Sequence, residues 1–249
     1  MIDSQSNRHL KELRKLRTAH GRAKSGSPPR FVAEGEDLIA AAQSVGWEPV
    51  ERFVAAGSGL EGTEVEPELL AGASSLGSGT RILAVYEQRW STPAGPLCVY
   101  LHGVGDPGNV GAILRSAQAF GAASVVLGPG SADPFGPKAV RASMGAVFTM
   151  PLARVPEPAH PGDRADVLEG LPGRTIALAA GLGAPLAGPL EGEATILIGA
   201  EREGLPPELL AAATETCRIP IQAESLNAAM AATVALYELT RKPTRVPAA

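Results

Sequence analysis

The sequence predicts an α/β protein in which a small α/β unit precedes a larger, mostly parallel sheet with helices on both faces. From residue 97 onward, short apolar runs alternate with helix-like segments, as is typical of parallel sheets that are buried on both faces. A stretch rich in proline and glycine separates this part from the first 90 residues. The chain has 249 residues, of which 45% are hydrophobic, so it can bury a core. Its aromatic content of 4% predicts that this core is aliphatic.

Residues 1–90 are expected to form the first unit. A basic helix is predicted over residues 7–19, because Leu10, Leu13 and Leu16 recur at helical spacing. Residues 21–29 have the composition of a loop. Strands are expected over residues 30–33, 50–55 and 81–85, and helices over residues 36–45 and 67–73. Residues 91–96 are expected to link this unit to the next one.

Residues 97–249 are expected to form the second unit. Its predicted strands are residues 98–101, 124–127, 147–151, 175–179, 195–199 and 218–221. Its predicted helices are residues 110–120, 137–142, 164–169, 206–212 and 225–241. In the last of these helices, the spacing of Leu226, Met230, Val234 and Tyr237 predicts the buried stripe.

The distribution of charge points to a polyanionic partner. The net charge is −4, yet residues 1–30 contain eight Lys or Arg side chains against two acidic ones, a local charge of +6 that leaves −10 for the remainder. Such asymmetry is typical of proteins that contact nucleic acid, although a solvated basic helix has the same composition.

Several other classes of protein are not expected. Cys98 and Cys217 lie in apolar, strand-like runs, which favours buried free thiols. Neither the cysteines nor the four histidines have the spacing of a metal site, so no metal is expected. The sequence has no apolar leader and no membrane-spanning run, and we therefore expect a cytoplasmic protein without membrane contact.

A glycine-rich segment, residues 102–116, follows a predicted strand and opens a predicted helix. Asn109 stands at the expected helix start, where its side chain can cap free N–H groups. Arg115 is expected on the outer face of the helix, near the carboxyl edge of the sheet, where ligands bind in open parallel sheets. The segment is therefore a candidate binding site.

The same turn matches a dinucleotide-binding fingerprint, because Gly103, Gly105 and Gly108 have the G-x-G-x-x-G spacing. Asp106 and Pro107 interrupt that loop, and no clear acidic residue ends the next predicted strand to bind a ribose. A nicotinamide-dependent enzyme is therefore disfavoured.

Two further segments combine small and polar residues. In residues 133–145, Lys138, Arg141 and Ser143 place two cations and a hydroxyl near a turn, which suits either phosphate contact or a capped surface helix. In residues 196–227, two apolar runs end close to Glu201 and Ser225, and Ser225 is a plausible helix N-cap. That arrangement suits a small molecule with an apolar and a hydrogen-bonding part.

Together these segments resemble the SpoU/TrmH-type RNA ribose 2′-O-methyltransferases of the knotted SPOUT superfamily, over roughly residues 97–241. The resemblance is carried by three stretches, namely NVGAILR (109–115), GAEREGL (199–205), and IPI (219–221) with SLN (225–227). The N-terminal part, with Asn7, the basic helix and FVAEG (31–35), resembles the L30e-like RNA-binding domain that often precedes this catalytic domain.

The resemblance implies a homodimer with active-site residues from both protomers, a deep trefoil knot, and S-adenosylmethionine as cofactor. The catalytic positions it implies are Arg115, Asn109, Glu201, Ser225 and Asn227. The cofactor positions are Ala179, Ala180, Gly181, Ile198, Gly199, Ala200, Gly204, Ile219, Ile221 and Leu226. The positions expected to contact RNA are Arg8, Lys11, Arg14, Lys15, Arg22, Lys24, Arg30, Lys138, Arg141 and Ser143.

The expected reaction is methyl transfer to a ribose 2′-hydroxyl, with ribosomal RNA favoured over transfer RNA because of the L30e-like part. A transfer RNA enzyme and a non-catalytic RNA-binding relative are the alternatives. A guanidinium is a poor base, so we expect Arg115 to activate the hydroxyl electrostatically. The sequence departs from the family pattern at Ala200, at Ile221 and in the short turn of residues 222–224.

Overall fold

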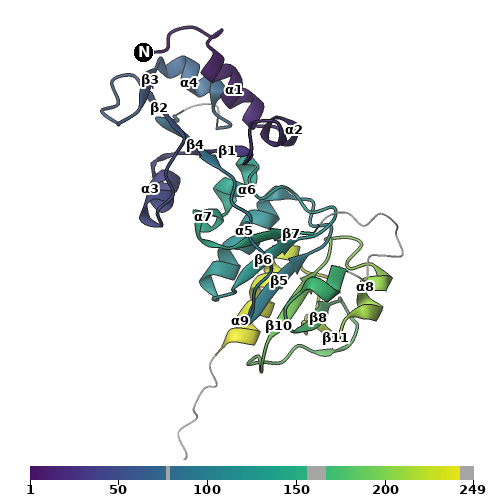
Figure 1. Cartoon of the computed structure of the whole chain (residues 1–249). Coiled ribbons are helices and arrows are strands. Elements are labelled where there is room, and N and C mark those ends of the chain that lie inside the picture. The colour runs from purple at the N-terminus through teal and green to yellow at the C-terminus, as the bar shows by residue number, and fades with distance from the viewer. Residues whose placement is uncertain (77–78, 156–166, 242–249) are drawn as a thin grey trace, which may run out of the picture. The chain divides into compact units, whose positions relative to one another are not determined.

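The computed structural model describes residues 1–76, 79–155 and 167–241 (Figure 1). These residues form two compact units. The first contains residues 1–89 and 133–149, and the second contains residues 90–132 and 150–249. Residues 133–149 thus group with the N-terminal unit, although they follow the expected linker by some forty residues in sequence.

The first unit is built on a four-stranded sheet with the order β1-β4-β2-β3. Its strands are β1 (Arg30–Glu34), β2 (Glu51–Ala55), β3 (Thr63–Val65) and β4 (Ile82–Glu87). β4 pairs antiparallel with β1 and β2, whereas β2 and β3 are parallel. The helices are α1 (Arg8–Leu16), α2 (Ala19–Ala23), α3 (Glu36–Ser44), α4 (Pro67–Ala73), α6 (Pro137–Ala142) and α7 (Ala146–Thr149). α2 occupies the start of the segment predicted as a loop.

The leucines of α1 are buried, as their spacing predicts. Leu10, Leu13 and Leu16 are at most 5% exposed and join the core of the first unit. Asn7 caps the helix, because its side chain accepts a hydrogen bond from the backbone N–H of His9. The basic side chains of α1 consequently lie on its remaining faces.

An aromatic cluster holds α6 and α7 in the first unit. The cluster consists of five rings, each of which has its centroid within 6.2 Å of at least one other, namely Phe31, Trp47, Tyr86, Phe135 and Phe148. The indole N–H of Trp47 also donates a 2.7 Å hydrogen bond to the carbonyl of Phe148. The expectation of a purely aliphatic core is therefore wrong for this unit, because the cluster alone gathers half of the ten aromatic residues of the chain.

The second unit is built on a seven-stranded sheet with the order β7-β6-β5-β10-β8-β11-β9, and all its strand pairs are parallel. The strands are β5 (Leu97–Leu101), β6 (Ser124–Leu127), β7 (Leu152–Arg154), β8 (Arg174–Leu178), β9 (Ala184–Pro185), β10 (Ala194–Ile198) and β11 (Glu215–Arg218). The helices are α5 (Pro107–Ala119), α8 (Pro207–Ala212) and α9 (Ala228–Thr240). The predicted parallel α/β fold is confirmed.

Helices cover both faces of this sheet (Figure 1). Leu209 of α8 packs with Cys98 and Tyr100 of β5 on one face. α5 and α9 pack against each other, and they contact β6 and β10 respectively. Because successive side chains of a strand point to opposite faces, the other buried residues of β5, such as Val99, point to the face that α5 and α9 cover.

Two predicted elements differ from the structure in ways that have a physical cause. The predicted strand at residues 147–151 is wrong, because Ala146–Thr149 forms α7 and the strand begins at Leu152. A short buried apolar run has no periodicity that separates the two states. The predicted helix at residues 164–169 lies partly outside the described residues, and residues 167–170 form a short 3₁₀ turn.

The predicted buried stripe of α9 is also wrong. Met230, Val234 and Tyr237 are 62%, 41% and 57% exposed. The buried positions are instead mainly alanines, namely Ala228, Ala229, Ala232, Ala235, Leu236 and Leu239. Alanine lets α9 approach α5 closely, and the larger side chains that pattern reasoning favours are left on the outer face.

In the described part of the chain, no helix is both long and apolar enough to cross a bilayer.

Candidate active site

A tight turn follows β10 and presents Glu201. The backbone N–H of Ala200 donates to the carbonyl of Gly204 over 3.1 Å, and the N–H of Gly204 donates back to the carbonyl of Ala200 over 3.0 Å. A side chain at Gly199 would collide with the backbone of Gly204, so the turn requires glycine there. Glu201 lies in the turn that these contacts close, just beyond the carboxyl end of the strand.

Asn109 lies in the first turn of α5. The helix begins at Pro107 and is capped by Asp106, whose carboxylate accepts a 3.0 Å hydrogen bond from the backbone N–H of Asn109. The prediction that Asn109 itself caps the helix is therefore wrong. An aspartate followed by a proline at the first helical position is a start signal that the sequence does contain.

Three residues from distant parts of the chain form one hydrogen-bonded array, which we call the Asn109 array. The side-chain amide of Asn109 donates to the Glu201 carboxylate over 2.5 Å, and its carbonyl accepts from the amide of Asn227 over 3.0 Å. The carbonyl of Asn227 in turn accepts from the backbone N–H groups of Ala229 and Met230. Asn227 is thus the N-cap of α9, and the prediction that this helix starts at Ser225 is wrong.

The orientation of each amide in the array follows from its neighbours. The carbonyl of Asn227 is committed to the two N–H groups of the helix, so its NH₂ group must point to Asn109. Asn109 then presents its own carbonyl to Asn227 and its NH₂ group to Glu201. The helix cap therefore fixes the direction of every hydrogen bond as far as the carboxylate.

A cavity of about 450 Å³ lies beside the array, at the carboxyl ends of the central strands. Glu201 and Ser225 line it, together with apolar side chains such as Leu178, Ile198 and Ile219. Nine of the ten predicted cofactor positions line this cavity, namely Ala179, Ala180, Ile198, Gly199, Ala200, Gly204, Ile219, Ile221 and Leu226. The tenth, Gly181, lines an adjoining pocket with Ala180, Ile219 and Ile221. The size is within the range of small-molecule sites.

Arg115 is not joined to the array. It is exposed on α5, six residues after Asn109, which corresponds to about 9 Å along the helix axis. Ser225 lines the cavity and is exposed, but it makes no hydrogen bond to Asn109 or Glu201. The structure therefore brings three of the five predicted catalytic residues into contact and leaves Arg115 and Ser225 apart from them.

The two cysteines have no features of a nucleophile. Both are free and buried, as predicted. Burial raises the pKa of Cys98, and this effect outweighs the hydrogen bond from Ser124, which lowers it. The thiol therefore stays protonated. Burial also raises the pKa of Cys217. In the described ranges, no three His, Cys, Asp or Glu side chains gather as a metal site would require.

The residues expected to contact RNA fall into two groups. Arg8, Lys11, Lys15, Lys24, Lys138 and Arg141 are exposed on the first unit, and Arg14 and Arg30 are partly exposed there. Arg22 is only 4% exposed, and its guanidinium donates to Asp133 over 2.9 and 2.6 Å. Ser143 is fully buried, and its hydroxyl donates to the carbonyl of Val140. Arg22 and Ser143 thus make internal contacts, and their contact with RNA stays a prediction.

Comparison with known proteins identifies relatives along nearly the whole chain. A model of the SpoU rRNA methylase family matches residues 96–237, more than half of the chain. The 23S rRNA (guanosine(2553)-2′-O)-methyltransferase RlmP of Bacillus subtilis is 29% identical and covers 96% of this chain and 98% of its own length.

Two solved structures with bound AdoMet are similar over both units. The rRNA methyltransferase from Sinorhizobium meliloti has a TM-score of 0.81 and 29% identity, and the match covers 95% of each chain. The SpoU methyltransferase AviRb from Streptomyces viridochromogenes has a TM-score of 0.78 and 27% identity, and the match covers 93% of this chain and 96% of that one.

Proposed function

The chain belongs to the SpoU rRNA methylase family, and on that basis we propose which of its residues bind the methyl donor and which act on the ribose. It is an S-adenosylmethionine-dependent methyltransferase for the 2′-hydroxyl of ribosomal RNA. The observation that carries the assignment of roles is the Asn109 array, whose Glu201 lines the cavity at the sheet edge.

The residues around the cavity fit S-adenosylmethionine. Apolar side chains such as Leu178, Ile198 and Ile219 suit an adenine ring, and the carboxylates of Glu201 and Glu224 suit the hydroxyl and ammonium groups of the cofactor. When bound, S-adenosylmethionine supplies an activated methyl group. Ala200 and Ile221, where the sequence departs from the family pattern, both line the cavity, and both side chains are apolar.

The chain's own residues have two tasks, which are to orient the ribose hydroxyl and to manage its proton. Arg115 stays charged and stabilises negative charge that develops on the hydroxyl oxygen, which makes the hydroxyl more nucleophilic. Asn109 holds Glu201 through one carboxylate oxygen, which leaves the other oxygen to accept a hydrogen bond. Ser225, on the cavity wall, is placed to help orient the substrate.

We further propose that the active form is a homodimer. Met230, Val234 and Tyr237 form an exposed apolar stripe along α9. The ring of Phe120, the C-cap residue of α5, lies beside Tyr237 at a centroid distance of 6.2 Å and extends the stripe. Exposed apolar patches of this kind mark protein interfaces. Arg115 is exposed on α5. A second copy that covers the stripe therefore brings Arg115 to the interface, where it can contribute to an active site shared by the two protomers.

Three remaining assignments are also proposals. The exposed members of the predicted RNA-contacting set on the first unit bind the ribosomal RNA. The free thiols of Cys98 and Cys217 support a cytoplasmic location. The trefoil knot is supported by the insertion of β10 between β5 and β8, strands that precede it in sequence.

The test replaces Arg115 by Ala and by Lys, and it maps 2′-O-methyl groups in ribosomal RNA from cells that carry each variant. Arg115→Ala is expected to lose methylation while it retains cofactor binding by calorimetry, because the guanidinium acts on the hydroxyl and not on the cofactor. Arg115→Lys keeps the charge without the planar fork and is expected to regain part of the activity. Wild-type methylation by Arg115→Ala would refute the assigned role, and absence of cofactor binding by the wild type would indicate a non-catalytic relative.

A further inference from the structure

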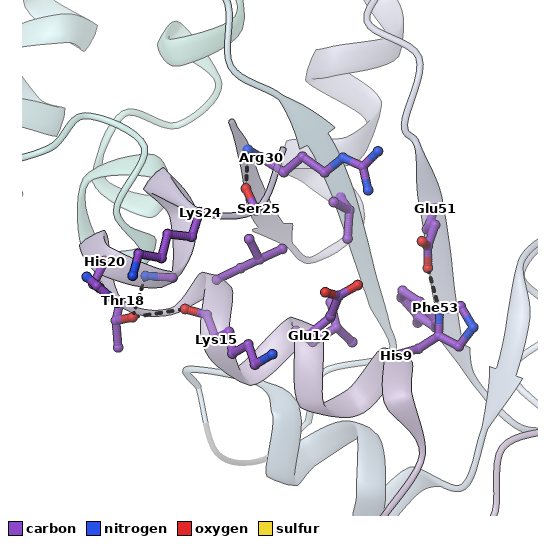
Figure 2. Close-up of a pocket in the computed structure, with 14 residues that line it drawn as sticks. His9, Glu12, Lys15, Thr18, His20, Lys24, Ser25, Arg30, Glu51 and Phe53 are labelled. Carbon is purple, nitrogen blue, oxygen red and sulfur yellow. Dashed lines mark hydrogen bonds and ion pairs between the residues drawn. The ribbon is translucent and has the colours of Figure 1, made fainter. Parts of the chain in front are cut away.

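A second cavity, of about 320 Å³, lies entirely within the first unit (Figure 2). Its walls come from α1, from α2 with its flanking turns, and from strands β1, β2 and β4. Three of the basic residues expected to contact RNA line it, namely Lys15, Lys24 and Arg30. The cavity therefore lies where part of the positive charge of the N-terminus is concentrated.

The floor of the cavity is apolar. Leu13, Leu16, Phe53 and Val85 line it, and each is at most 5% exposed and belongs to the hydrophobic core of the unit. A flat apolar ligand that enters the cavity would rest directly on this core. A simple anion site has no need of such a floor, because phosphate contacts are made by N–H groups and cations.

The polar side chains are arranged around this floor in a way that favours an anionic group at one end. Figure 2 shows Lys24 and His20 at one end of the cavity, His9 and Glu51 at the other, and Lys15 between them. Glu51 is already engaged by the His9 ring, whose Nδ1 lies 2.9 Å from its carboxylate.

Two further groups on the wall can bond to a ligand. The Nε atom of Arg30 is buried and has no hydrogen-bond partner among the described residues, so the wall holds an unsatisfied donor. Glu12 lines the cavity and is exposed on α1. Its carboxylate can accept a hydrogen bond from an amino or imino group of a base.

We propose that this cavity, here called the nucleotide pocket, binds one unstacked nucleotide of a single-stranded RNA segment. The base lies on the apolar floor, and the adjacent phosphate contacts Lys15 and Lys24. Proteins recognise RNA sequence mainly in single-stranded segments, whose splayed bases can leave the stack and enter such pockets. The inference rests on the proposed function only in taking RNA as the partner of the first unit.

The test measures binding of two fluorescein-labelled decamers to the full-length protein by fluorescence anisotropy. One probe is an RNA oligoadenylate, and the other is an abasic ribose-phosphate chain of the same length. Wild-type protein is expected to bind the oligoadenylate about tenfold more tightly, which is the contribution of one well-seated base.

Four variants separate the pocket from general basic attraction. Glu12→Trp fills the pocket and is expected to abolish the preference for the base-containing probe, whereas Glu12→Gln, which removes the charge without the bulk, preserves it. Lys15→Ala is expected to weaken binding of both probes about fivefold, because it removes a phosphate contact. Arg17→Ala, at the exposed C-cap of α1 and outside both the pocket and the set of predicted RNA-contacting residues, is the matched control and is expected to change affinity by less than about twofold.

Equal weakening by Lys15→Ala and Arg17→Ala would overturn the pocket, since the basic helix would then act as an unspecific surface. An undiminished preference for bases in Glu12→Trp would overturn it as well. Thermal unfolding and calorimetric cofactor binding of each variant exclude misfolding as the cause of a loss. Failure of the proposed function is recognised separately, because it appears as absent ribosomal RNA methylation by the wild type, whatever the probes show.

Discussion

Asn227 performs two tasks that a pair of substitutions can separate. Its carbonyl caps α9 through the N–H groups of Ala229 and Met230, and its NH₂ group holds Asn109. Asn227→Ala removes both. The lost cap costs about 1 kcal/mol and the lost exposed hydrogen bond about 0.5–1 kcal/mol, so we expect a destabilisation of about 1.5–2 kcal/mol. In a chain of this size that lowers the Tm by roughly 3–8 °C, which thermal unfolding followed by circular dichroism measures.

Asn227→Asp keeps the cap, because aspartate is an equally good N-cap residue and its charge is favourable at a helix N-terminus. It removes the donor to Asn109 and turns a second carboxylate toward the carbonyl that Asn109 presents. We therefore expect near wild-type stability, with a turnover number reduced on the order of tenfold to a hundredfold because Glu201 is no longer held in place.

The two variants make the reasoning refutable at both levels. Wild-type turnover by Asn227→Asp would show that the Asn109 array does not position a reacting group. A Tm for Asn227→Ala within about 1 °C of the wild type would show that the cap does not stabilise α9. A loss of stability in Asn227→Asp as large as in Asn227→Ala would contradict the separation of the two tasks.

Three other outcomes are expected. Arg22→Ala leaves the carboxylate of Asp133 without its cation and should destabilise the protein by about 3 kcal/mol in urea titrations, whereas Arg17→Ala at an exposed position should cost less than about 0.5 kcal/mol. Val234→Asp, in the exposed stripe of α9, should convert a dimer into monomers in sedimentation experiments while cofactor binding by each protomer persists. Burial raises the pKa of Cys98, so its reactive thiolate forms at a higher pH than that of an ordinary thiol. Iodoacetamide at pH 8 should therefore label Cys98 in unfolded protein much faster than in native protein.

Much of the second unit could be predicted because its signals are local. Each central strand is an apolar run of four or five residues between helix-like segments, and that alternation requires a parallel sheet. The predictions fail where local signals do not distinguish alternatives. Val147 and Phe148 are buried in a short apolar run that suits a strand or a helix equally. In α9, four of the six buried positions are alanines, so the large side chains Met230, Val234 and Tyr237 indicate the wrong face.

The candidate site shows the same division between local and distant information. Family resemblance identified Asn109, Glu201 and Asn227, but no periodicity relates residues that are 92 and 118 positions apart. The burial of Arg22 depends on its pairing with Asp133, which is 111 positions away. A basic residue in a basic helix has no local feature that shows it will be buried.

The return of residues 133–149 to the first unit has a consequence for how the chain must be made and handled. Phe135 and Phe148 complete the aromatic cluster around Phe31, and Asp133 neutralises Arg22. A ribosome has released the last strand of that unit, which ends at Glu87, long before these partners emerge. Residues 1–87 are therefore made some sixty residues before their last partners, and until then they expose aromatic surface and leave Arg22 without Asp133. A fragment cut at residue 90 would remain in that incomplete state.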